Sequence, residues 1–303
     1  MRAILLHNPN AGMKADKDNI LAALKLADFE VAYVSTKEDG IEAAFKKKAD
    51  LVVAAGGDGT IAEVLKLLPD RNIPVALLPM GTANNVARSL GIAGTPQELV
   101  ERWKLDHHCP LDIGMVKAPW GTSQFLESFG LGLFARFLMM AAKRKKPEGA
   151  TNLRKGRELL QKVIKEVEPI EAEVSIDGRK VNGEFLGVEV MNTPFTGPGL
   201  PLAAKAHAGD GLLNVILFED GQRKDLIKWI DSPQDEPPPV TARQGKTIEV
   251  TWSDVPNRVD DEYFENKDKK QIAEISCQEE QARILIPVKH PAQKAHEPGK
   301  KPA

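Results

Sequence analysis

Residues 56–60 read Gly-Gly-Asp-Gly-Thr, and they directly follow the apolar run Ala49–Ala55. The run predicts a buried strand, and the pattern from Thr60 to Leu68 predicts a helix that begins right after the glycines. Glycines let a backbone approach a ligand closely, and the N-terminus of a helix presents unpaired N–H groups that suit phosphate. Asp58 adds a carboxylate to this phosphate-sized niche. A carboxylate beside a bound phosphate needs a cation to offset the repulsion, and Mg²⁺ is the usual one.

Two further segments favour a ligand site over the simpler explanation of a tight strand-to-helix turn in which Asp58 is only a cap. A first strand at residues 2–7 runs into the polar segment 8–12. A third strand at residues 73–78 runs into the polar segment 79–85, before a helix at 86–91. The carboxyl ends of strands in an open parallel sheet converge at one edge, where ligands bind. We therefore expect the three polar, glycine-containing loops to form one site.

The chain resembles the diacylglycerol kinase catalytic-domain family, which includes bacterial lipid kinases and is related to the sphingosine kinases. The matching motifs follow the family's order along most of the chain: Asn8-Pro9 with Gly12, Gly56-Gly57-Asp58-Gly59-Thr60, Pro79 with Gly81-Thr82-x-Asn84, Leu111-Asp112-Ile113-Gly114, Ser128-Phe129-Gly130-Leu131-Gly132, Gly209-Asp210-Gly211-Leu212-Leu213, and Val259-Asp260-x-Glu262. The first three are specific as a set, and the later ones are individually weak. The resemblance implies an α/β N-terminal domain like that of NAD kinases and diacylglycerol kinases, followed by an all-β, sandwich-like domain.

The rhythm of the chain changes near residue 105. Residues 1–105 alternate strand and helix patterns, which predicts an α/β domain with a parallel sheet. Residues 106–288 predict an antiparallel, β-rich domain, and the sequence leaves open whether its last strand returns to the first domain. The resemblance implies that the first domain binds nucleotide and that the second binds the lipid substrate. Residues 289–303, rich in Lys, Pro and His, predict a disordered tail. The strands expected after residue 105 are 107–117, 123–130, 170–176, 183–191, 212–218, 247–252 and 282–287.

Composition is that of an ordinary protein with two domains. The chain has 303 residues and a formal net charge of -2, so no strong field draws it to nucleic acid and we expect no such partner. Its two cysteines and scattered histidines show no zinc-binding spacing. The chain starts with a strand rather than a signal peptide, and no apolar run reaches the length of a membrane span. We expect a cytoplasmic protein that visits the membrane surface, and a homodimer remains open.

Residues 133–168 predict a long helical stretch that is broken by the basic segment 143–149. The apolar residues of 134–140 precede this cluster of Lys and Arg. An apolar face flanked by basic residues has the composition of an interfacial element. We predict that Lys143–Lys146 and the Phe134–Met140 face make peripheral contact with an anionic bilayer. The simpler alternative is a helix packed on the sandwich, with its charged end in solvent.

Phosphoryl transfer needs a positioned triphosphate, neutralised charge and a base beside the attacking hydroxyl. The three loops are predicted to supply the first requirement for ATP. No Walker-A lysine is present, which excludes a P-loop enzyme. Both threonines in the loops also suit simple helix capping. The predicted nucleotide-binding residues are Asn8, Pro9, Gly12, Gly56, Gly57, Gly59, Thr60, Gly81, Thr82 and Asn84.

Four acidic residues are the candidates for the chemistry. The resemblance implies that Asp58 and Asp112 hold Mg²⁺, partly through water; without it, Asp112 would be taken for a strand-end carboxylate in solvent. The resemblance also implies that Asp260 deprotonates the lipid hydroxyl, and that Glu262 is the second carboxylate of the same motif. A neighbouring carboxylate raises basicity by like-charge repulsion. We assign catalytic roles to Asp260, Glu262 and Asp58. The alternative is that residues 260–265 form a solvated acidic turn.

Several departures from the family pattern affect the lipid side. Asn85 stands where many relatives have Asp, and Glu127 stands where relatives often have Asn. Asp261 replaces the Gly of the Asp-Gly-Glu motif, and a positive φ there would be strained. Asn214 and Gly209 replace carboxylates of a segment that carries a structural Mg²⁺ in some relatives, which argues against a second metal.

The leading interpretation is an ATP- and Mg²⁺-dependent lipid kinase that phosphorylates diacylglycerol or a related membrane lipid. Nucleotide would bind the first domain, and the lipid head would lie against the second. A NAD kinase-like enzyme is an alternative, because that family shares the Gly-Gly-Asp-Gly turn. The segments 79–85 and 259–262 favour the lipid branch. The departures leave a third alternative, a nucleotide- or lipid-binding pseudokinase with a regulatory role.

Overall fold

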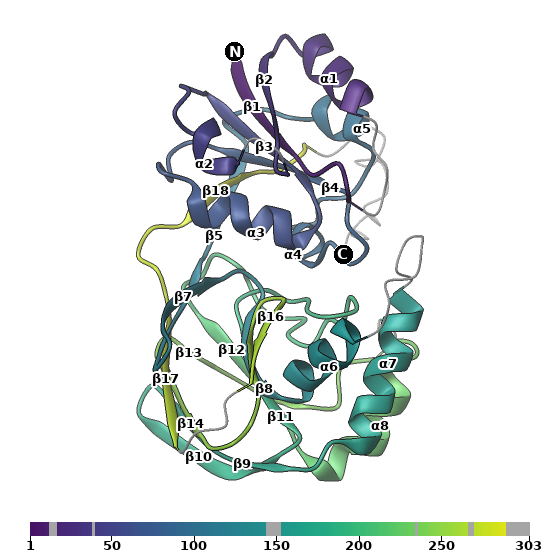
Figure 1. The fold of residues 1–303 in the computed structure, drawn as a ribbon, viewed down its shortest axis with the longest axis vertical. Helices are drawn as coiled ribbons and strands as arrows, with labels where there is room; N and C mark the ends of the chain where they lie inside the picture. The colour runs from purple at the N-terminus through teal and green to yellow at the C-terminus, as the bar shows by residue number, and fades with distance from the viewer. Residues whose placement is uncertain (12–16, 38–39, 144–152, 234–235, 266–269, 289–303) are drawn as a thin grey trace, which may run out of the picture.

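The protein is described here by a computed structural model that covers residues 1–11, 17–37, 40–143, 153–233, 236–265 and 270–288. An α/β domain stacks on a β-sandwich, as Figure 1 shows, so the predicted fold class is confirmed. The predictions for Gly12, for Arg144–Lys146 and for the tail 289–303 fall outside the described residues.

The α/β domain is built on a six-stranded sheet in the order β2-β1-β3-β4-β18-β5. Its first four strands run parallel. β3 is buried along its whole length, because helices cover both faces of the sheet. In Figure 1, α1 and α5 lie together on one side of the sheet and α2 and α3 on the other. These elements are β1 (Arg2–His7), α1 (Lys17–Leu26), β2 (Glu30–Ser35), α2 (Ile41–Ala44), β3 (Leu51–Gly56), α3 (Asp58–Leu67), β4 (Val75–Pro79), α4 (Asn85–Ser89) and α5 (Pro96–Val100).

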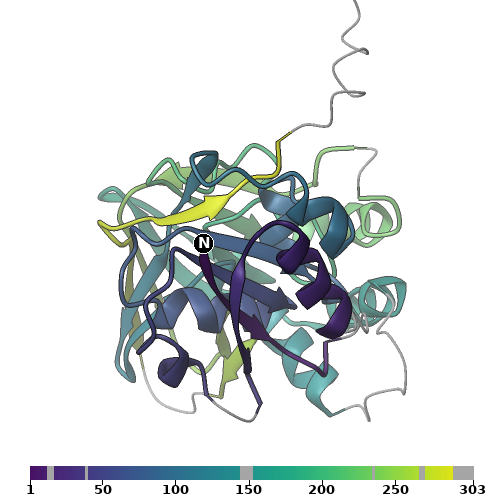
Figure 2. The ribbon, with the colours of Figure 1, turned by 90° about the horizontal axis from the view of Figure 1, so that it is seen from above.

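Two strands beyond residue 105 complete this sheet. β18 (Ala282–Leu285) pairs with β4 in parallel, and β5 (His108–Leu111) pairs with β18 antiparallel. The last strand therefore does return to the first domain, a point that the sequence left open. Figure 2 looks down onto the α/β domain and shows the yellow strand β18 lying within it.

The sandwich consists of two antiparallel sheets, in the orders β10-β9-β14-β17-β6-β7 and β13-β12-β11-β8-β15-β16. Apolar side chains from both sheets, among them Phe129, Val174 and Trp252, fill the space between them. The strands are β6 (Gly114–Ala118), β7 (Gly121–Phe125), β8 (Ser128–Gly132), β9 (Ile170–Ile176), β10 (Arg179–Phe185), β11 (Gly187–Met191), β12 (Leu213–Phe218), β13 (Thr241–Gly245), β14 (Ile248–Trp252), β15 (Asn257–Val259), β16 (Glu262–Phe264) and β17 (Gln271–Cys277).

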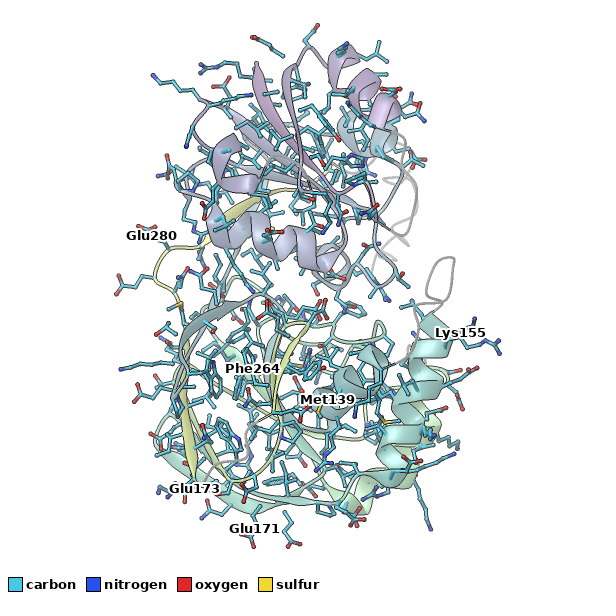
Figure 3. All side chains as sticks on the ribbon, viewed as in Figure 1. Met139, Lys155, Glu171, Glu173, Phe264 and Glu280 are labelled. Carbon is cyan, nitrogen blue, oxygen red and sulfur yellow. The ribbon has the colours of Figure 1, made fainter. Side chains whose placement is uncertain are left out.

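Three helices, α6 (Leu133–Ala142), α7 (Leu153–Glu166) and α8 (Arg223–Trp229), cover the outer face of the β8-containing sheet. Phe134 and Phe137 of α6 are buried in the core beneath these helices. Those two side chains therefore cannot contact a bilayer, and for them the packed-helix alternative is correct. The charged face of α7 points outward, as Lys155 does in Figure 3.

Three predicted strands are each wrong in the same way, because each one is two strands that lie in different sheets. Residues 107–117 form β5 and β6, residues 123–130 form parts of β7 and β8, and residues 183–191 form parts of β10 and β11. The chain steps between sheets at residues 112–113, 126–127 and 186. A continuous run of strand-forming residues gives no sign of such a step. Two of the steps place acidic residues, Asp112 and Glu127, in the interior.

Candidate active site between the two domains

A cleft of about 390 Å³ lies between α3 and the sandwich. The first wall is formed by α3 with Val86 from α4. The second wall is formed by the β7–β8 step and by the turn that joins β15 to β16. The structure thus brings the three predicted catalytic residues, Asp58, Asp260 and Glu262, into one cleft. The remaining lining residues are Gly59, Ala62, Glu63, Lys66, Leu67, Leu126, Glu127, Val259 and Asp261.

The loop after β1 is tied to the first turn of α3. The side-chain amide of Asn8 donates to Thr60 Oγ1 at 3.0 Å, and the Asn8 backbone N–H donates to the Ala55 carbonyl. Gly56 packs on the same threonine, since a Cβ at residue 56 would lie 2.6 Å from Thr60 Cβ. The glycine is therefore required by close packing, and Thr60 joins the two loops.

The loop after β4 packs against the same turn, backbone to backbone. A Cβ on Gly81 would lie 2.7 Å from the Cα of Gly57. Asn84 adopts the left-handed conformation, with φ 50°. Its side chain accepts from the Gly81 N–H at 2.7 Å and donates to the Gly81 carbonyl at 2.9 Å. The loops at the ends of β1, β3 and β4 therefore meet, as their place at the carboxyl edge predicts.

The start of α3 is open to a ligand. Its N-cap is Gly57, which makes no side-chain capping bond, and nothing lies within 4 Å of the position that a Cβ of Gly59 would occupy. Neither predicted threonine is a cap: Thr60 lies inside α3, and the N-cap of α4 is Asn84. The unpaired N–H groups of this helix start are free to meet an anion.

Asp58 carries its carboxylate from the first turn of α3 into the cleft. Its Oδ1 accepts from the Val86 N–H at 3.0 Å, an interaction that lowers the pKa. Loss of solvent on burial outweighs that hydrogen bond, and with the negative charges of Asp261 and Asp260 it raises the pKa of Asp58 to about 6. Excess negative charge of this kind is what a bound cation relieves.

Asp260 is held from several directions. Its carboxylate accepts from the backbone N–H groups of Leu126 and Glu127 at 2.9–3.1 Å, and Lys66 Nζ lies 2.9 Å from Oδ2. Its own backbone adopts a left-handed φ of 50°. The positive φ of this turn thus falls on Asp260, and the strain expected at Asp261 is a wrong prediction. Glu262, in β16, is exposed at the rim of the cleft.

Glu127 is a cleft residue that sequence reasoning did not place in the site. Its Oε2 accepts from the Asn85 side-chain amide at 3.1 Å. Burial raises the pKa of Glu127 well above its ordinary value, and the charges of Asp58, Asp261 and Asp260 raise it further, while Arg258 acts in the opposite direction. The departures at residues 85 and 127 are therefore partners in one hydrogen bond. Relative to the pattern that the resemblance implies, the amide and the carboxyl group of this pair have exchanged positions.

Asp112 does not line the cleft. It is 1% exposed, so it is not a solvated strand-end carboxylate either. Its Oδ2 accepts from the Gly211 N–H at 2.7 Å, and its Oδ1 accepts from Gln281 Nε2 at 2.6 Å. Asp112 thus anchors the loop before β12 and the segment before β18, and the structure does not bring it together with Asp58. Within the described ranges, no three His, Cys, Asp or Glu side chains converge in a group that could hold a metal ion.

The segment before β12 explains one departure from the family pattern. A Cβ on Gly209 would lie 2.6 Å from the carbonyl oxygen of Pro110, so close packing requires a glycine there. Asn214, the other departure in this segment, is buried in β12 and accepts a hydrogen bond from Gln244. Both residues serve packing in this chain.

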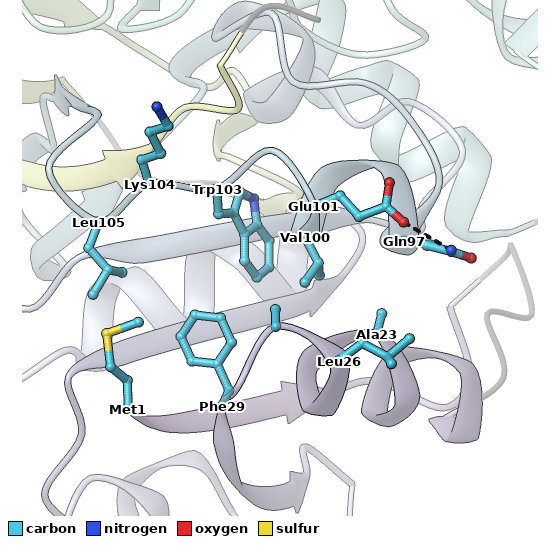
Figure 4. Close-up of a pocket in the computed structure, with 11 residues that line it drawn as sticks. Met1, Ala23, Leu26, Phe29, Gln97, Val100, Glu101, Trp103, Lys104 and Leu105 are labelled. Atoms are coloured by element: carbon cyan, nitrogen blue, oxygen red, sulfur yellow. Dashed lines mark hydrogen bonds between the residues drawn. The ribbon is translucent and has the colours of Figure 1, made fainter.

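A larger hollow, of about 490 Å³, lies between α1 and α5 (Figure 4). Phe29, Val100, Trp103 and Leu105 give it a mostly apolar lining. None of the predicted site residues belongs to this lining. The side chains that can carry phosphoryl transfer gather in the smaller cleft.

Among the helices of the described ranges, none is long and apolar enough to cross a membrane.

Comparison with known proteins places both domains in the same group. Residues 2–116 match the diacylglycerol kinase catalytic domain, and residues 150–271 match the YegS C-terminal NAD kinase beta sandwich-like domain. A diacylglycerol kinase of Bacillus subtilis (strain 168) is 29% identical over 247 residues, which cover 75% of this chain and 77% of that protein. A probable lipid kinase YegS-like of Pseudomonas aeruginosa (strain UCBPP-PA14) is 30% identical over 227 residues, 72% of each chain.

Solved structures show the same fold. A putative diacylglycerol kinase from Bacillus anthracis str. Sterne superposes with a TM-score of 0.68 at 22% identity, covering 96% of this chain and 98% of its own. An NAD kinase from Archaeoglobus fulgidus, in complex with ATP, superposes with a TM-score of 0.52 at 18% identity, covering 95% and 94%. The matched domains and the extent of the sequence relatives agree with the motifs, and this chain belongs to the diacylglycerol kinase catalytic-domain family of lipid kinases.

Proposed function

We propose that the protein is an ATP- and Mg²⁺-dependent lipid kinase, which transfers the γ-phosphate to a hydroxyl of diacylglycerol or a related membrane lipid. The observation that carries this proposal is the arrangement of the cleft. On one wall, the open start of α3 suits phosphate. On the other wall, the backbone N–H groups of Leu126 and Glu127 donate to the Asp260 carboxylate and hold it in place. A phosphate donor and a hydroxyl acceptor need this arrangement of anion site and base.

The reaction follows from the positions of the two walls. The N–H groups at the start of α3 hold the triphosphate, together with the loops at Asn8 and Gly81 that pack against this helix start. Asp260 takes the proton from the lipid hydroxyl, whose oxygen forms a bond to the γ-phosphorus while the bond from that phosphorus to the β–γ bridging oxygen breaks. ADP leaves with the electron pair of the broken bond. The N–H groups of Leu126 and Glu127 fix the direction of the Asp260 carboxylate.

The residues present fit a Mg²⁺ ion at Asp58. Mg²⁺ is commonly held by one or two carboxylates together with substrate phosphates and water, so a cage of three protein ligands is not required. Burial and the charges of Asp261 and Asp260 raise the pKa of Asp58. A bound cation would stabilise the charged form of this carboxylate. When bound, the ion neutralises charge on the β- and γ-phosphates. Asp112 supports the site only as a buried anchor of its surroundings.

A panel of acceptors tests the proposal. Purified protein with ATP and Mg²⁺ is offered diacylglycerol, phosphatidylglycerol and a sphingoid base in mixed vesicles, with NAD as a soluble acceptor, and labelled product is measured. We expect phosphate in at least one lipid and none in NAD, with most activity lost in Asp58→Asn. Transfer to NAD alone would establish the NAD kinase-like alternative. Binding of ATP by calorimetry without transfer to any acceptor would establish the pseudokinase.

We further propose that the protein is cytoplasmic and reaches its lipid by peripheral contact through the end of α6. Met139 and Met140 are partly exposed there and Lys143 is exposed, next to the basic residues at 144–146. Each basic residue at an anionic surface contributes on the order of 1 kcal/mol. Changing residues 143–146 to Ser should reduce co-sedimentation with anionic vesicles and raise KM for the lipid but not for ATP. The exposed Lys46–Lys48 on the first domain, changed to Ser, provide the control. Equal sedimentation of both variants would remove this surface from the proposal.

A further inference from the structure

A fully buried ion pair lies next to the cleft. Arg258 in β15 is 1% exposed and Glu189 in β11 is 0% exposed, and Arg258 Nη2 lies 2.9 Å from Glu189 Oε2. The two strands are not neighbours, because β8 runs between them. In the register of the sheet, both residues are paired with Gly130 of β8. Residues in register point to the same face, so the two side chains meet across a position that has no side chain.

The Arg258–Glu189 ion pair requires a glycine at residue 130. A Cβ at residue 130 would overlap the Glu189 carboxylate. The pair lies on the helix-covered face of the sheet, where the Arg258 guanidinium is 5.2 Å from the centre of the Phe134 ring of α6. Burying two charges in such apolar surroundings has a desolvation cost that their attraction does not reliably offset. Stability alone therefore does not account for an arginine here.

The other hydrogen bonds of Arg258 point toward the active site. Its Nη1 donates to the carbonyl oxygen of Asp260 at 2.8 Å. Its Nη2 donates to the hydroxyl of Ser128, whose own carbonyl accepts from the Asp260 N–H at 2.9 Å. Both backbone groups of Asp260 are thus fixed, one of them by Arg258 directly. Asp260 is the non-glycine residue of this turn with a positive φ, a conformation that needs support from its surroundings.

Arg258 also contacts a loop that reaches the first domain. Its Nη2 donates to Thr196 Oγ1 at 2.7 Å. The next residue, Gly197, accepts a hydrogen bond from the Asn85 side chain of α4 at 3.0 Å. One guanidinium therefore connects Asp260 with the loop that touches the nucleotide domain. Its planar fork of donors suits contacts in several directions, which the single ammonium of a lysine cannot reproduce.

We propose that Arg258, with Glu189 as its buried counter-charge, is a positioning residue that fixes the left-handed turn at Asp260. The fixed turn directs the Asp260 carboxylate to the N–H groups of Leu126 and Glu127. The catalytic consequence of this role rests on the proposed function, whereas the positioning itself does not.

Hydrogen exchange tests the positioning without any need for activity. The variants are Arg258→Lys, Arg258→Met and Glu189→Gln, and the control is Val174→Ala, a buried position of β9 in the other sheet. In the arginine variants, the amides of Leu126 and Glu127 should exchange about tenfold faster or more, because their acceptor is no longer held. Amides of β9 and β14 should be unchanged. Equal protection of Leu126 and Glu127 in Arg258→Lys and in Val174→Ala would overturn the proposal, and Arg258→Lys serves if Arg258→Met does not fold.

Kinetics of the same variants test the consequence for catalysis. A misplacement of about 1 Å can lower the rate of an enzyme by about 10²-fold, so kcat of Arg258→Lys should fall by about tenfold or more while KM for ATP stays within about twofold. Val174→Ala should retain kcat. Unchanged kcat in Arg258→Lys would contradict the inference and leave the proposed function intact. A wild-type protein without phosphotransfer would contradict the proposed function, and the exchange experiment would still decide the positioning.

Discussion

The two walls of the cleft are built by different means. Behind the wall of the first domain, glycines and backbone groups hold the loops together: Gly57 and Gly81 touch through their backbones, and Asn84 closes its loop on Gly81. On the sandwich wall, charged side chains make the surface, with Glu127 and Asp260 buried and Asp261 and Glu262 exposed. Asp260 and Arg258, at the end of β15, and Glu127, at the β7–β8 step, come from two segments far apart in the sequence and depend on one another.

The difference has a physical basis. A phosphate site at a helix start needs close approach of the backbone, and a short run of residues can provide that. A base needs a carboxylate in a fixed direction and in a defined electrostatic setting, and strands that pair over long distances in the sequence provide that. The first wall should therefore be sensitive to added atoms and the second wall to removed charges.

Asp260→Asn should have the largest effect of any single change to the sandwich wall. An asparagine keeps one oxygen that can accept from the N–H groups of Leu126 and Glu127, but it is no base. General base catalysis contributes about 10²–10⁴-fold, so kcat should fall by that order while calorimetric ATP affinity stays close to that of the wild type. Glu262→Gln, on the exposed rim, provides the comparison and should lose less than about tenfold. If kcat of Asp260→Asn is higher than kcat of Glu262→Gln, then Glu262 is the general base and Asp260 is the supporting carboxylate.

Asp58→Asn probes the place where the two walls face each other, through the pH dependence of stability. The pKa of Asp58 is raised from 3.8 to about 6, mainly by burial and then by Asp261 and Asp260. Between these values the folded protein binds more protons than the unfolded chain, so stability is lost as pH rises. The variant lacks this loss. Relative to the wild type, ligand-free Asp58→Asn should therefore gain on the order of 2 kcal/mol in unfolding free energy between about pH 4 and about pH 7.

Urea unfolding at a series of pH values measures this difference, and Asp50→Asn is a control of opposite sign. The backbone and side-chain hydrogen bonds from Arg2 lower the pKa of Asp50. The wild type therefore gains stability over Asp50→Asn as pH rises, in a window below the ordinary pKa of an aspartate. A pH-independent difference between wild type and Asp58→Asn would show that burial and the charges of Asp261 and Asp260 do not raise the pKa of Asp58.

The contrast between the two walls also explains which parts of the fold and of the site could be predicted from the sequence. The three loops at the carboxyl edge of the first domain's sheet were predictable, because Gly56, Gly57 and Gly81 are required by close packing that short sequence motifs record. The α/β rhythm and the change to a β-rich half were predictable for the same reason, since periodicity is local. Asp260 was found through a motif, but its positive φ was assigned to its neighbour.

The residues that sequence reasoning missed depend on contacts between distant segments. Glu127 lies at a step between two sheets inside a run that looks like one strand, so its burial was not visible. Arg258 and Glu189 meet only because both are in register with Gly130, and strand register is not written in any one segment. Lys66 could have been found. It lies eight residues after Asp58, about two helical turns, and so on the same face of α3.

Gly81→Ala and Gly59→Ala separate packing from ligand contact on the first wall. The new Cβ in Gly81→Ala would lie 2.7 Å from Gly57 Cα and 2.9 Å from Asn84 Oδ1, so the loops must move apart at a cost of about 1–3 kcal/mol in stability. The new Cβ in Gly59→Ala meets no atom, and alanine is the better helix former, so stability should hold or rise slightly.

Both variants should raise KM for ATP, but for different reasons. Thermal melts of the ligand-free proteins distinguish these reasons, because only Gly81→Ala should lose stability. In Gly81→Ala the loop geometry is lost along with stability. In Gly59→Ala the methyl group occupies the open space at the start of α3. A Gly59→Ala protein with wild-type stability and wild-type ATP affinity would show that the triphosphate does not lie at this helix start.

Lys66→Met should have the smallest effect, because the contact between the walls that it removes is partly solvated. The side chains of Lys66 and Asp260 are 29% and 12% exposed, and an ion pair in such a position contributes about 1 kcal/mol. Methionine keeps the apolar stem packed, so the loss of unfolding free energy should stay near that value. Among the described residues that line the cleft, Lys66 is the one basic side chain beside six acidic ones, so its removal should also weaken binding of the ATP anion several-fold. The effect should shrink as salt screens the cleft, and Lys66→Arg, which keeps the charge, should bind ATP as the wild type does. If Lys66→Met binds ATP unchanged at low salt, then Lys66 serves Asp260 alone and the triphosphate is held by the backbone of the first wall.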